Sequence, residues 1–318
     1  MWYIDTLQKY KPKTFKTHFV VFGTGYYDYR EPLKAEIPEL GRFKGSLIHH
    51  QFWPEDLNYT SKTIVVIGSG ETAITVIPKL AEVATKFARF LSLLSQVPRL
   101  GSANDSSHHN VATTRSHLIR SAQPWDQRLC ICPDGVLFTS LRSGNVEIKT
   151  NTSESITESS IRLKSGDFLA AGIIATATGL KIQFAGGIRI LVDGREFFLN
   201  ENFILKEMMM QNLPNVTLVI GYTNISWTLG ADVTGILLCR ILKHLNKRGG
   251  AAVVPRVPKS IHLEKRRMLE LNSTCVSKAG NDLPKTAQRW PWQLRNNYLL
   301  GIIHAMYGRV DEFLDVIV

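Results

Sequence analysis

The feature that most constrains the fold is a β-branched run followed at once by a glycine turn and a helical pattern. Residues 62–67 read KTIVVI, a short apolar run typical of a buried parallel strand. The turn over residues 68–73 reads G-x-G-x-x-A, and apolar residues then recur at helical spacing up to Phe87. A further strand is expected at residues 89–94. This order predicts a βαβ unit of a Rossmann-like, dinucleotide-binding α/β domain.

The small residues of this turn have a physical purpose if the turn holds a pyrophosphate. Gly68 permits a tight turn, Gly70 lets the backbone approach the phosphates, and Ala73 allows the helix to pack closely on the strand. The helix N-terminus adds unpaired N–H groups and a partial positive charge. The predicted cofactor-binding residues are Gly68, Ser69, Gly70, Glu71, Thr72 and Ala73. The alternative is a turn that uses glycine for packing alone.

The end of the second strand indicates which nucleotide the turn accepts. An acidic residue there would bind the ribose 2′-hydroxyl and exclude a 2′-phosphate. This chain has Ser95 and Gln96 at that point, with Arg99 close behind. NADP is therefore permitted, and Gln96 is a predicted cofactor contact, although glutamine holds a phosphate less firmly than arginine. A separate strand is expected earlier in the chain, at residues 17–22. It also ends in Gly-x-Gly, but no helix follows, so we expect a strand-to-loop turn there.

Composition excludes several other classes of protein. With 318 residues, 44% of them apolar, the chain can bury a large core in two domains or in one domain with an insertion. Its net charge of +11 is not accompanied by a zinc-finger, RRM or KH pattern, so nucleic acid is not expected as a partner. The four cysteines form neither a disulfide framework nor paired metal knuckles, which favours a reducing, cytoplasmic location and no metal site. No apolar run is long enough to predict a membrane span.

The rest of the chain is expected to contain strands and helices without an internal repeat. Residues 96–127 are polar and are predicted to form a long loop. The other expected strands lie near residues 129–131, 146–150, 160–164, 171–176 and 217–220, and the other expected helices near residues 231–245 and 296–305.

Four separate motifs add a resemblance to a known family. The pattern F-x-G-x-x-x-H-x-x-x-W-[P/D] resembles the fingerprint of flavin-dependent Baeyer-Villiger monooxygenases. Its residues in this chain are Phe43, Gly45, His49 and Trp53. The other three motifs are PWDQRLC at 124–130, ATATGL at 175–180 and GYTNISWTL at 221–229. They look like those of the ethionamide-activating branch of this group, within the wider flavin-containing monooxygenase family, and the similarity runs from roughly residue 19 to residue 298.

The resemblance implies chemistry with FAD and NADPH. In the family the nicotinamide reduces the flavin, and O2 then adds to form a flavin C4a-peroxide. That peroxide attacks a ketone or transfers oxygen to sulfur or nitrogen. The implied partners are therefore O2 and a small ketone, thioether or amine.

The resemblance also assigns residue roles. Arg128 lies where the family carries an active-site arginine, which would stabilise negative charge in the reaction and hold the nicotinamide. The alternative for Arg128 is a surface ion pair. Gly179 lies in the return crossing into the flavin domain. Trp227 and Thr228 lie in the segment that precedes the last helix of that domain, whose N-terminus would face the flavin pyrimidine. The alternative for these three residues is ordinary packing of sheet and helix.

The fingerprint residues have a different implied role. In the family this segment lies on the linker between the two nucleotide domains, so His49 and Trp53 would couple nicotinamide binding to domain rotation. They are not proposed as a general acid or as metal ligands. The alternative is that both are packed linker residues.

The implied fold is α/β, with a Rossmann-like NADP lobe inserted into the C-terminal part of a disulfide-reductase-like FAD domain. The expected parts are a remnant of the FAD domain with the fingerprint linker at 1–57, the NADP lobe with a shortened insertion at 58–170, the return into the FAD domain at 171–250, and a C-terminal tail at 251–318.

The chain also departs from the family pattern. No G-x-G-x-x-G for FAD precedes Phe43, so an N-terminal truncation is expected. The competing hypothesis is a catalytically inactive, truncated homologue that acts only as a nucleotide-binding or interaction module. A relative of the pyridine nucleotide-disulfide reductases is disfavoured because no redox CxxC occurs. A serine hydrolase is excluded because G-x-S-x-G is absent.

Overall fold

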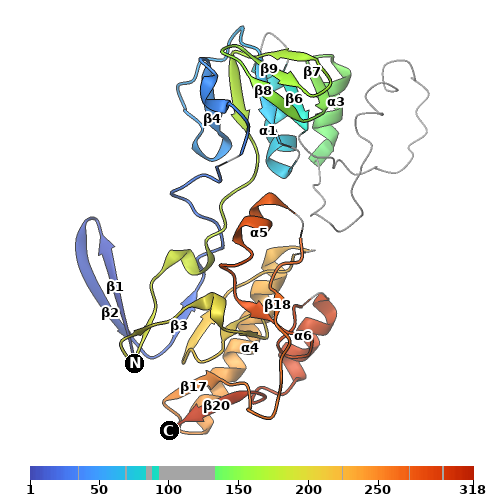
Figure 1. The fold of residues 1–318 in the computed structure, drawn as a ribbon. Coiled ribbons are helices and arrows are strands. Elements are labelled where there is room, and N and C mark those ends of the chain that lie inside the picture. The colour runs from blue at the N-terminus through green and yellow to red at the C-terminus, as the bar shows by residue number, and fades with distance from the viewer. Residues whose placement is uncertain are drawn as a thin grey trace. The chain divides into compact units, whose positions relative to one another are not determined.

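The structure, a computed structural model, divides the chain into two compact units (Figure 1). It describes residues 1–34, 36–68, 70–83, 88–92, 133–223, 225–271, 273–295 and 297–318. Unit 1 consists of Met1–Tyr27, Ile182–Glu270 and Lys278–Val318. Unit 2 consists of Asp28–Lys181 and Leu271–Ser277.

Unit 2 is built on a parallel sheet of five strands in the order β4-β11-β5-β6-β7. The strands are β4 (Ser46–His49), β5 (Ile64–Ile67), β6 (Ala88–Ser92), β7 (Val146–Thr150) and β11 (Ile173–Thr176). From β5 the chain continues through β6 to β7 on one side, whereas β11 pairs with the other side of β5. The strand order thus reverses between β5 and β11, and such a reversal is where open α/β sheets bind ligands. The α/β fold expected from the sequence is confirmed.

Strand β5 is buried on both faces, as its β-branched sequence predicts. Ile64 and Val66 pack into an apolar cluster with helices α1 (Glu71–Val83) and α3 (Val136–Arg142). Val65 and Ile67 point to the opposite face, because successive side chains of a strand alternate. There they pack against a second, antiparallel sheet. That sheet consists of β8 (Ser153–Ile156), β9 (Ser160–Leu163) and β10 (Phe168–Ala170).

Helix α1 follows the glycine turn and covers one face of the sheet. Its buried residues in this cluster are Ala73, Ile74, Ile77, Leu80 and Ala81, at the spacing expected for one helical face. Full burial of each large side chain contributes about 1.5–3 kcal/mol. The helix continues through Pro78 to Val83, and residues 84–87, which were also predicted to be helical, lie outside the described residues.

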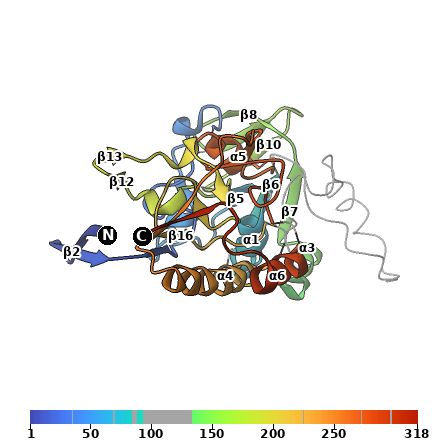
Figure 2. The ribbon, with the colours of Figure 1, turned by 90° about the horizontal axis from the view of Figure 1, so that it is seen from below.

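The core of unit 1 contains buried residues of two helices and of several short strands. Strand β3 (Val20–Phe22) pairs in parallel with β16 (Val216–Leu218). Helices α4 (Trp227–Lys247) and α6 (Tyr298–Tyr307) lie side by side (Figure 2). Arg240 of α4 joins them, because its Nη1 and Nη2 donate to the carbonyls of Ala305 and Gly308 at 2.7 and 2.8 Å. Trp292 is fully buried in this core.

The remaining elements are short. The strands are β12 (Leu191–Val192), β13 (Arg195–Glu196), β14 (Ile204–Leu205), β15 (Met209–Met210), β17 (Ala252–Pro255), β18 (Arg266–Arg267), β19 (Lys285–Thr286) and β20 (Leu314–Ile317). Helix α5 spans Thr274–Ala279. The 3-10 turns are Leu40–Arg42, His50–Phe52, Pro133–Gly135, Phe184–Gly187 and Leu199–Glu201.

The opening segment differs from the single strand predicted at residues 17–22. The chain begins with a hairpin of β1 (Trp2–Gln8) and β2 (Lys11–Thr17), which extends away from the rest of unit 1 (Figure 1), and β3 begins only at residue 20. The hairpin could not be predicted from the sequence for two reasons. Strand β2 is polar and exposed and β1 has no fully buried residue, and the turn between them places Lys9 and Tyr10 at positive φ without the usual Asn-Gly signal.

Most other predicted elements occur within a few residues of their expected positions. Strand β7 matches its prediction, α4 is longer than the predicted 231–245 and begins at Trp227, and α6 is shifted to start after Asn297. The predicted strand at 129–131 and loop at 96–127 lie outside the described residues. Residues 251–318, expected to form a tail, contribute β17, α6 and β20 to the structure.

Candidate functional site

The glycine turn lies at the carboxyl end of β5, next to the reversal of strand order. Gly68 has φ +149°, and a Cβ there would collide with the carbonyl of Ala177, which follows β11. The two strands approach this closely because the N–H of Ala177 donates to the carbonyl of Ile67 at 2.7 Å. Only glycine fits at position 68. A Cβ on Gly70, by contrast, would meet no atom within 4 Å, so this face of the turn is open.

The first turn of α1 completes an anion-binding arrangement. The N–H of Ile74 is the first with a helical partner, the carbonyl of Gly70 at 3.2 Å. The N–H groups of residues 71–73 precede it and have no partner within the helix. Ala73 is fully buried against the sheet, which fixes the helix axis. The open backbone at Gly70 and this helix N-terminus therefore fit a pyrophosphate.

The first two fingerprint residues form a packing pair in unit 2. A Cβ on Gly45 would lie 2.5 Å from both the carbonyl oxygen of Gly172 and the ring of Phe43. Phe43 is itself 9% exposed and joins the apolar cluster beneath β5. The F-x-G spacing thus lets an aromatic ring fold back over a residue that has no side chain.

The histidine part of the fingerprint segment binds the backbone of β11. His50 Nδ1 lies 3.1 Å from the carbonyl of Thr176, and since a carbonyl only accepts, this nitrogen carries the proton. Thr176 Oγ1 donates back to the carbonyl of Ile48 at 3.2 Å. His49 Nδ1 accepts the N–H of Gln51 at 3.3 Å, and its ring lies 4.4 Å from that of His50.

Both histidines favour the neutral form. Burial lowers the pKa of His49, and the neighbouring His50 lowers it further. Burial also lowers the pKa of His50, against the opposing effect of its bond to Thr176. Trp53 is half-buried against the cluster on the helix face of the sheet. His49 and Trp53 are therefore held within the packing of unit 2.

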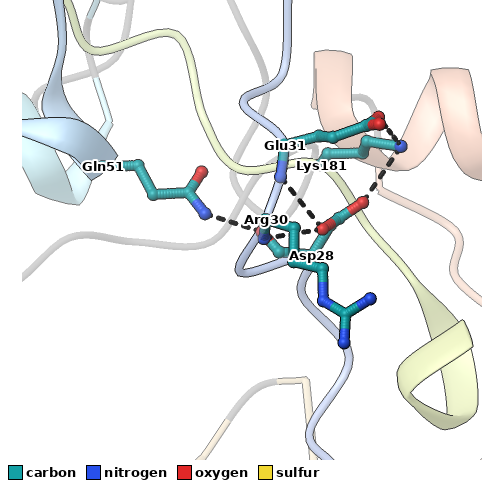
Figure 3. Close-up of polar contacts among 5 residues, drawn as sticks. All are labelled: Asp28, Arg30, Glu31, Gln51 and Lys181. Atoms are coloured by element: carbon teal, nitrogen blue, oxygen red, sulfur yellow. Dashed lines mark hydrogen bonds and ion pairs between the residues drawn. The ribbon is translucent and has the colours of Figure 1, made fainter. Parts of the chain in front are cut away.

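An ion-pair cluster joins the two segments by which the chain enters and leaves unit 2 (Figure 3). The Asp28 side chain is 3% exposed and accepts the N–H groups of Arg30 and Glu31 at 2.9 and 3.1 Å. Lys181 Nζ lies 3.0 Å from Asp28 Oδ2 and 2.6 Å from Glu31 Oε2. Gln51 Nε2 donates to the Asp28 carbonyl at 2.6 Å.

The charges of this cluster stabilise one another. The N–H of Arg30 and the ammonium of Lys181 lower the pKa of Asp28. Glu31 and Asp28 raise the pKa of Lys181. In addition, the Asp28 N–H donates to the Lys181 carbonyl at 2.8 Å. Sequence reasoning missed this cluster, since no motif relates residues that lie about 150 positions apart.

Two further predicted residues lie in unit 1, at the N-terminus of α4. Trp227 stacks on Tyr26 with 4.5 Å between ring centroids and 10° between planes. Its ring also covers Gly221, where a Cβ would collide with it, and Thr228 Oγ1 lies 2.7 Å from the hydroxyl of the N-cap serine. A Cβ on Gly230 would lie 2.7 Å from Gly221 Cα. Because residue 230 is glycine, the first turn of α4 can pack closely on the backbone at Gly221.

The structure thus places the predicted residues in two groups. In unit 2 it holds Phe43, Gly45, His49, Trp53, Gly68, Gly70, Glu71, Thr72, Ala73 and Gly179, and in unit 1 it holds Trp227 and Thr228. Ser69, Gln96 and Arg128 lie outside the described residues. Within the described ranges, no group of three His, Cys, Asp or Glu side chains could hold a metal ion, and no helix is long and apolar enough to cross a membrane.

Comparison with known proteins points in one direction. The probable FAD-binding monooxygenase AlmA of Acinetobacter baylyi is 34% identical over 363 aligned positions, which cover 98% of this chain and 72% of that protein. The FAD-containing monooxygenase EthA of Mycobacterium tuberculosis is 35% identical over 344 positions, which cover 92% of this chain and 70% of that protein. No protein-family model matches the chain.

Solved structures show the same fold. An open crystal structure of cyclohexanone monooxygenase superposes with a TM-score of 0.64 at 16% identity, and covers 96% of this chain and 75% of that one. An oxidized steroid monooxygenase bound to NADP superposes with a TM-score of 0.62 at 15% identity, and covers 98% of this chain and 79% of that one. At such identities the likeness concerns the fold alone, which is the α/β arrangement predicted from the sequence.

Proposed function

Because the chain belongs to the family of FAD-binding monooxygenases, we propose that it uses FAD and NADPH to transfer one oxygen atom of O2 to a small organic substrate. The proposed substrate is a ketone, a thioether or an amine. The observation that carries the proposal is the turn at the end of β5, where Gly68 is pressed against Ala177 and Gly70 faces open space.

The NADPH part of the proposal is supported by unit 2. The open backbone at Gly70 and the N–H groups of the first α1 turn would hold the pyrophosphate. This turn lies where the strand order reverses, the position at which doubly wound sheets bind nucleotides. We accordingly assign the parallel sheet of unit 2 to the NADP lobe. Its strands β5, β6 and β7 lie within the range predicted for that lobe, residues 58–170, whereas β4 and β11 lie outside it.

The FAD part rests on unit 1. The first turn of α4 presents N–H groups beside Trp227 and Thr228, and a helix N-terminus favours negative charge on a flavin ring. The chain has no second strand-glycine-helix turn for the ADP half of FAD. The residues present therefore fit the flavin ring better than the rest of the cofactor, and FAD retention must be measured directly.

In the proposed reaction, bound FAD supplies the electrons and the activation of O2 after its reduction by NADPH. The chain's own residues would bind the cofactors and orient them. The α1 N-terminus would fix the nucleotide phosphates, and His50, which adjoins the fingerprint residue His49, would position β11 beside them. Arg128 remains the proposed active-site arginine, which would stabilise negative charge during oxygen transfer.

The test is a pair of measurements on the full chain. We expect the purified protein to retain a flavin absorption band after incubation with FAD and gel filtration, and to oxidise NADPH faster when a thioether or ketone is added. NADPH binding without flavin retention and without oxidation would contradict the enzymatic proposal. That outcome would instead favour the inactive nucleotide-binding module.

A further inference from the structure

Unit 1 has an exposed hairpin that the proposed function does not use. Strands β1 and β2 form a sheet of their own, to which no other strand of the described residues is added. Gln8 pairs with Lys11, so the turn between the strands consists of Lys9 and Tyr10 alone. Residues 7–13 are named the hairpin tip, and all of them are exposed to solvent.

The turn of the hairpin has an unusual sequence for its backbone conformation. Lys9 and Tyr10 have φ values of 49° and 64°, so both adopt the left-handed conformation. A two-residue turn of this kind favours Asn-Gly, because asparagine and glycine accept positive φ more readily than other residues. Here a lysine and an aromatic residue take these positions. Since residues in such conformations cluster at functional sites, these two side chains are candidates for contact with a partner.

The hairpin tip exposes apolar side chains that the fold leaves largely uncovered. Tyr10 is 98% exposed and Leu7 is 74% exposed. Leu7 pairs with Pro12 across the strands, so the two side chains lie on one face of the hairpin. At the other end, Trp2 Nε1 donates to the carbonyl of Pro214 at 3.0 Å. The hairpin is thus anchored at its base, and its tip presents apolar groups to the solvent.

The hairpin tip is also strongly basic. It contains Lys9, Lys11 and Lys13 and no acidic residue, which gives a charge of +3. The one acid of the hairpin, Asp5, lies further from the turn and accepts from Thr14 Oγ1 at 2.6 Å. Unit 1 as a whole has 21 Lys and Arg against 12 Asp and Glu, a net charge of +9, whereas unit 2 has 17 against 15. A negatively charged partner therefore complements both the tip and the unit that carries it.

From this combination we propose that the hairpin tip binds an anionic membrane surface. The three lysines would lie among the lipid headgroups, because basic residues are attracted to a negatively charged leaflet. Tyr10 and Leu7 would enter the interface, where tyrosine is favoured and where burial of apolar side chains strengthens binding. This binding requires neither FAD nor NADPH.

Two other roles account for only part of the hairpin tip. Lysines on an exposed hairpin prevent strands of other chains from pairing with it, but an exposed leucine and an exposed tyrosine do not serve that purpose. A nucleic acid would also attract the lysines, and its bases could stack on Tyr10. It offers no apolar layer for Leu7, however, whereas a membrane interface complements the charge and the apolar groups together.

The first test is flotation of the full chain with lipid vesicles, without added FAD or NADPH. We expect the chain to bind vesicles of phosphatidylcholine with phosphatidylserine, and to bind vesicles of phosphatidylcholine alone at least about tenfold more weakly. High salt should weaken binding to the anionic vesicles, because it screens exposed charges. Absence of binding to the anionic vesicles, or equal binding to both kinds, would overturn the proposal. Because no cofactor is added, the result is independent of the proposed oxygenase activity.

The second test removes side chains of the tip and keeps the hairpin. The double variant Lys9→Asn with Tyr10→Gly gives the turn the residue pair that its conformation favours, so the thermal unfolding midpoint should not fall. Its binding to the anionic vesicles should fall by about tenfold or more, because a charge and the most exposed ring of the tip are lost. Lys11→Gln alone should weaken binding by about fivefold. Unchanged binding by the double variant would contradict the assignment.

Matched controls separate the hairpin tip from the rest of the surface. Lys164→Gln removes an exposed lysine in the turn after β9, and Leu191→Ser removes a 45% exposed leucine of β12. Leu7→Ser should weaken binding to the anionic vesicles by about fivefold or more, whereas both controls should bind like wild type. Equal losses in the controls would show that the tip is not the contact.

The same double variant distinguishes other occupants of the tip. Wild-type protein is titrated with a DNA duplex, and its mass is followed by sedimentation over a range of protein concentrations. Duplex binding or dimer formation that the double variant abolishes, in a protein that binds no anionic vesicles, would assign the tip to a nucleic acid or to a second copy of this chain. Either result would overturn the membrane proposal.

Discussion

Gly68 and Gly70 lie two residues apart in one turn, but the structure gives them different reasons to be glycine. Position 68 combines a positive φ with a backbone carbonyl where a Cβ would stand. Position 70 has neither constraint, and a methyl group there would project into open space. The first glycine serves the fold, whereas the second keeps the backbone accessible to a ligand.

This difference predicts opposite phenotypes for two alanine variants. Gly68→Ala should lower the stability of unit 2 by roughly 1–3 kcal/mol or more, because strain and overlap add. Gly70→Ala should unfold like wild type but bind NADPH about tenfold more weakly, a loss of about 1.4 kcal/mol. Urea unfolding and NADPH fluorescence measure the two effects. Unchanged NADPH affinity in Gly70→Ala would argue for a turn that serves packing alone.

The stability of the folded protein at acidic pH should depend on the ionisation of the Asp28 side chain. Its pKa lies below the ordinary value of 3.8, mainly because the Arg30 N–H, and then Lys181, favour the ionised form. Ionised Asp28 therefore stabilises the folded state above the unfolded pKa, and this stabilisation is lost as pH falls through the lowered folded pKa.

The variant Asp28→Asn tests this sign. It should be less stable than wild type at neutral pH, but it should lose less stability as the pH is lowered below 3.8. Urea midpoints over a pH series measure the difference, with Asp56→Asn as an exposed control in the same unit. Parallel pH profiles for Asp28→Asn and wild type would show that the carboxylate does not carry the effect.

Residue roles could be predicted from the sequence only where they are local. The glycines of the 68–73 turn are readable because strand, turn and helix are consecutive. The ion pair between Lys181 and Glu31 could not be predicted, because the two residues lie 150 positions apart in the sequence. Lysine and glutamate are also common surface residues, so neither marks a site.

At the scale of elements, α4 contains two glycines with contrasting surroundings. A Cβ on Gly230 would lie 2.9 Å from the Ile220 carbonyl, whereas a Cβ on Gly235 would meet nothing within 4 Å. Gly230→Ala should therefore destabilise unit 1 by about 1–3 kcal/mol through overpacking. Gly235→Ala should stabilise it by about 0.5–1 kcal/mol, because glycine is a poor helix former.

Thermal unfolding of the two variants measures these shifts against wild type. A stabilised Gly230→Ala variant would mean that the helix start is not pressed against the 221 turn. A destabilised Gly235→Ala variant would mean that the middle of α4 is covered on that side. Either result would contradict the packing described for this helix.

Elements were predictable where the hydrophobic pattern has a clear period. The buried β5 and the helix α4 have such patterns, whereas β2 is polar, β1 has no buried residue and their turn lacks a glycine. Short strands of two residues, such as β14 and β18, have no period at all. They are fixed by tertiary contacts that no window of the sequence contains.

At the scale of the whole molecule, the described residues contain the strand-glycine-helix turn proposed for NADP in unit 2 and the α4 N-terminus proposed for the flavin in unit 1. The chain spans 72% of AlmA and 70% of EthA, the two relatives described above. The α/β fold and the family could be predicted from motifs in their correct order. The substrate could not, because the motifs that indicate the family concern the cofactors and not the group that accepts the oxygen.

The transfer of oxygen from O2 to a substrate tests the proposed monooxygenase activity most directly. The full chain is incubated with FAD, NADPH, a thioether and isotopically labelled O2, and the sulfoxide is examined by mass spectrometry. We predict that one labelled oxygen atom enters the product, and that Gly70→Ala lowers the rate mainly by raising the KM for NADPH. Unlabelled sulfoxide, or none above a control without protein, would contradict the claim that this chain is a monooxygenase.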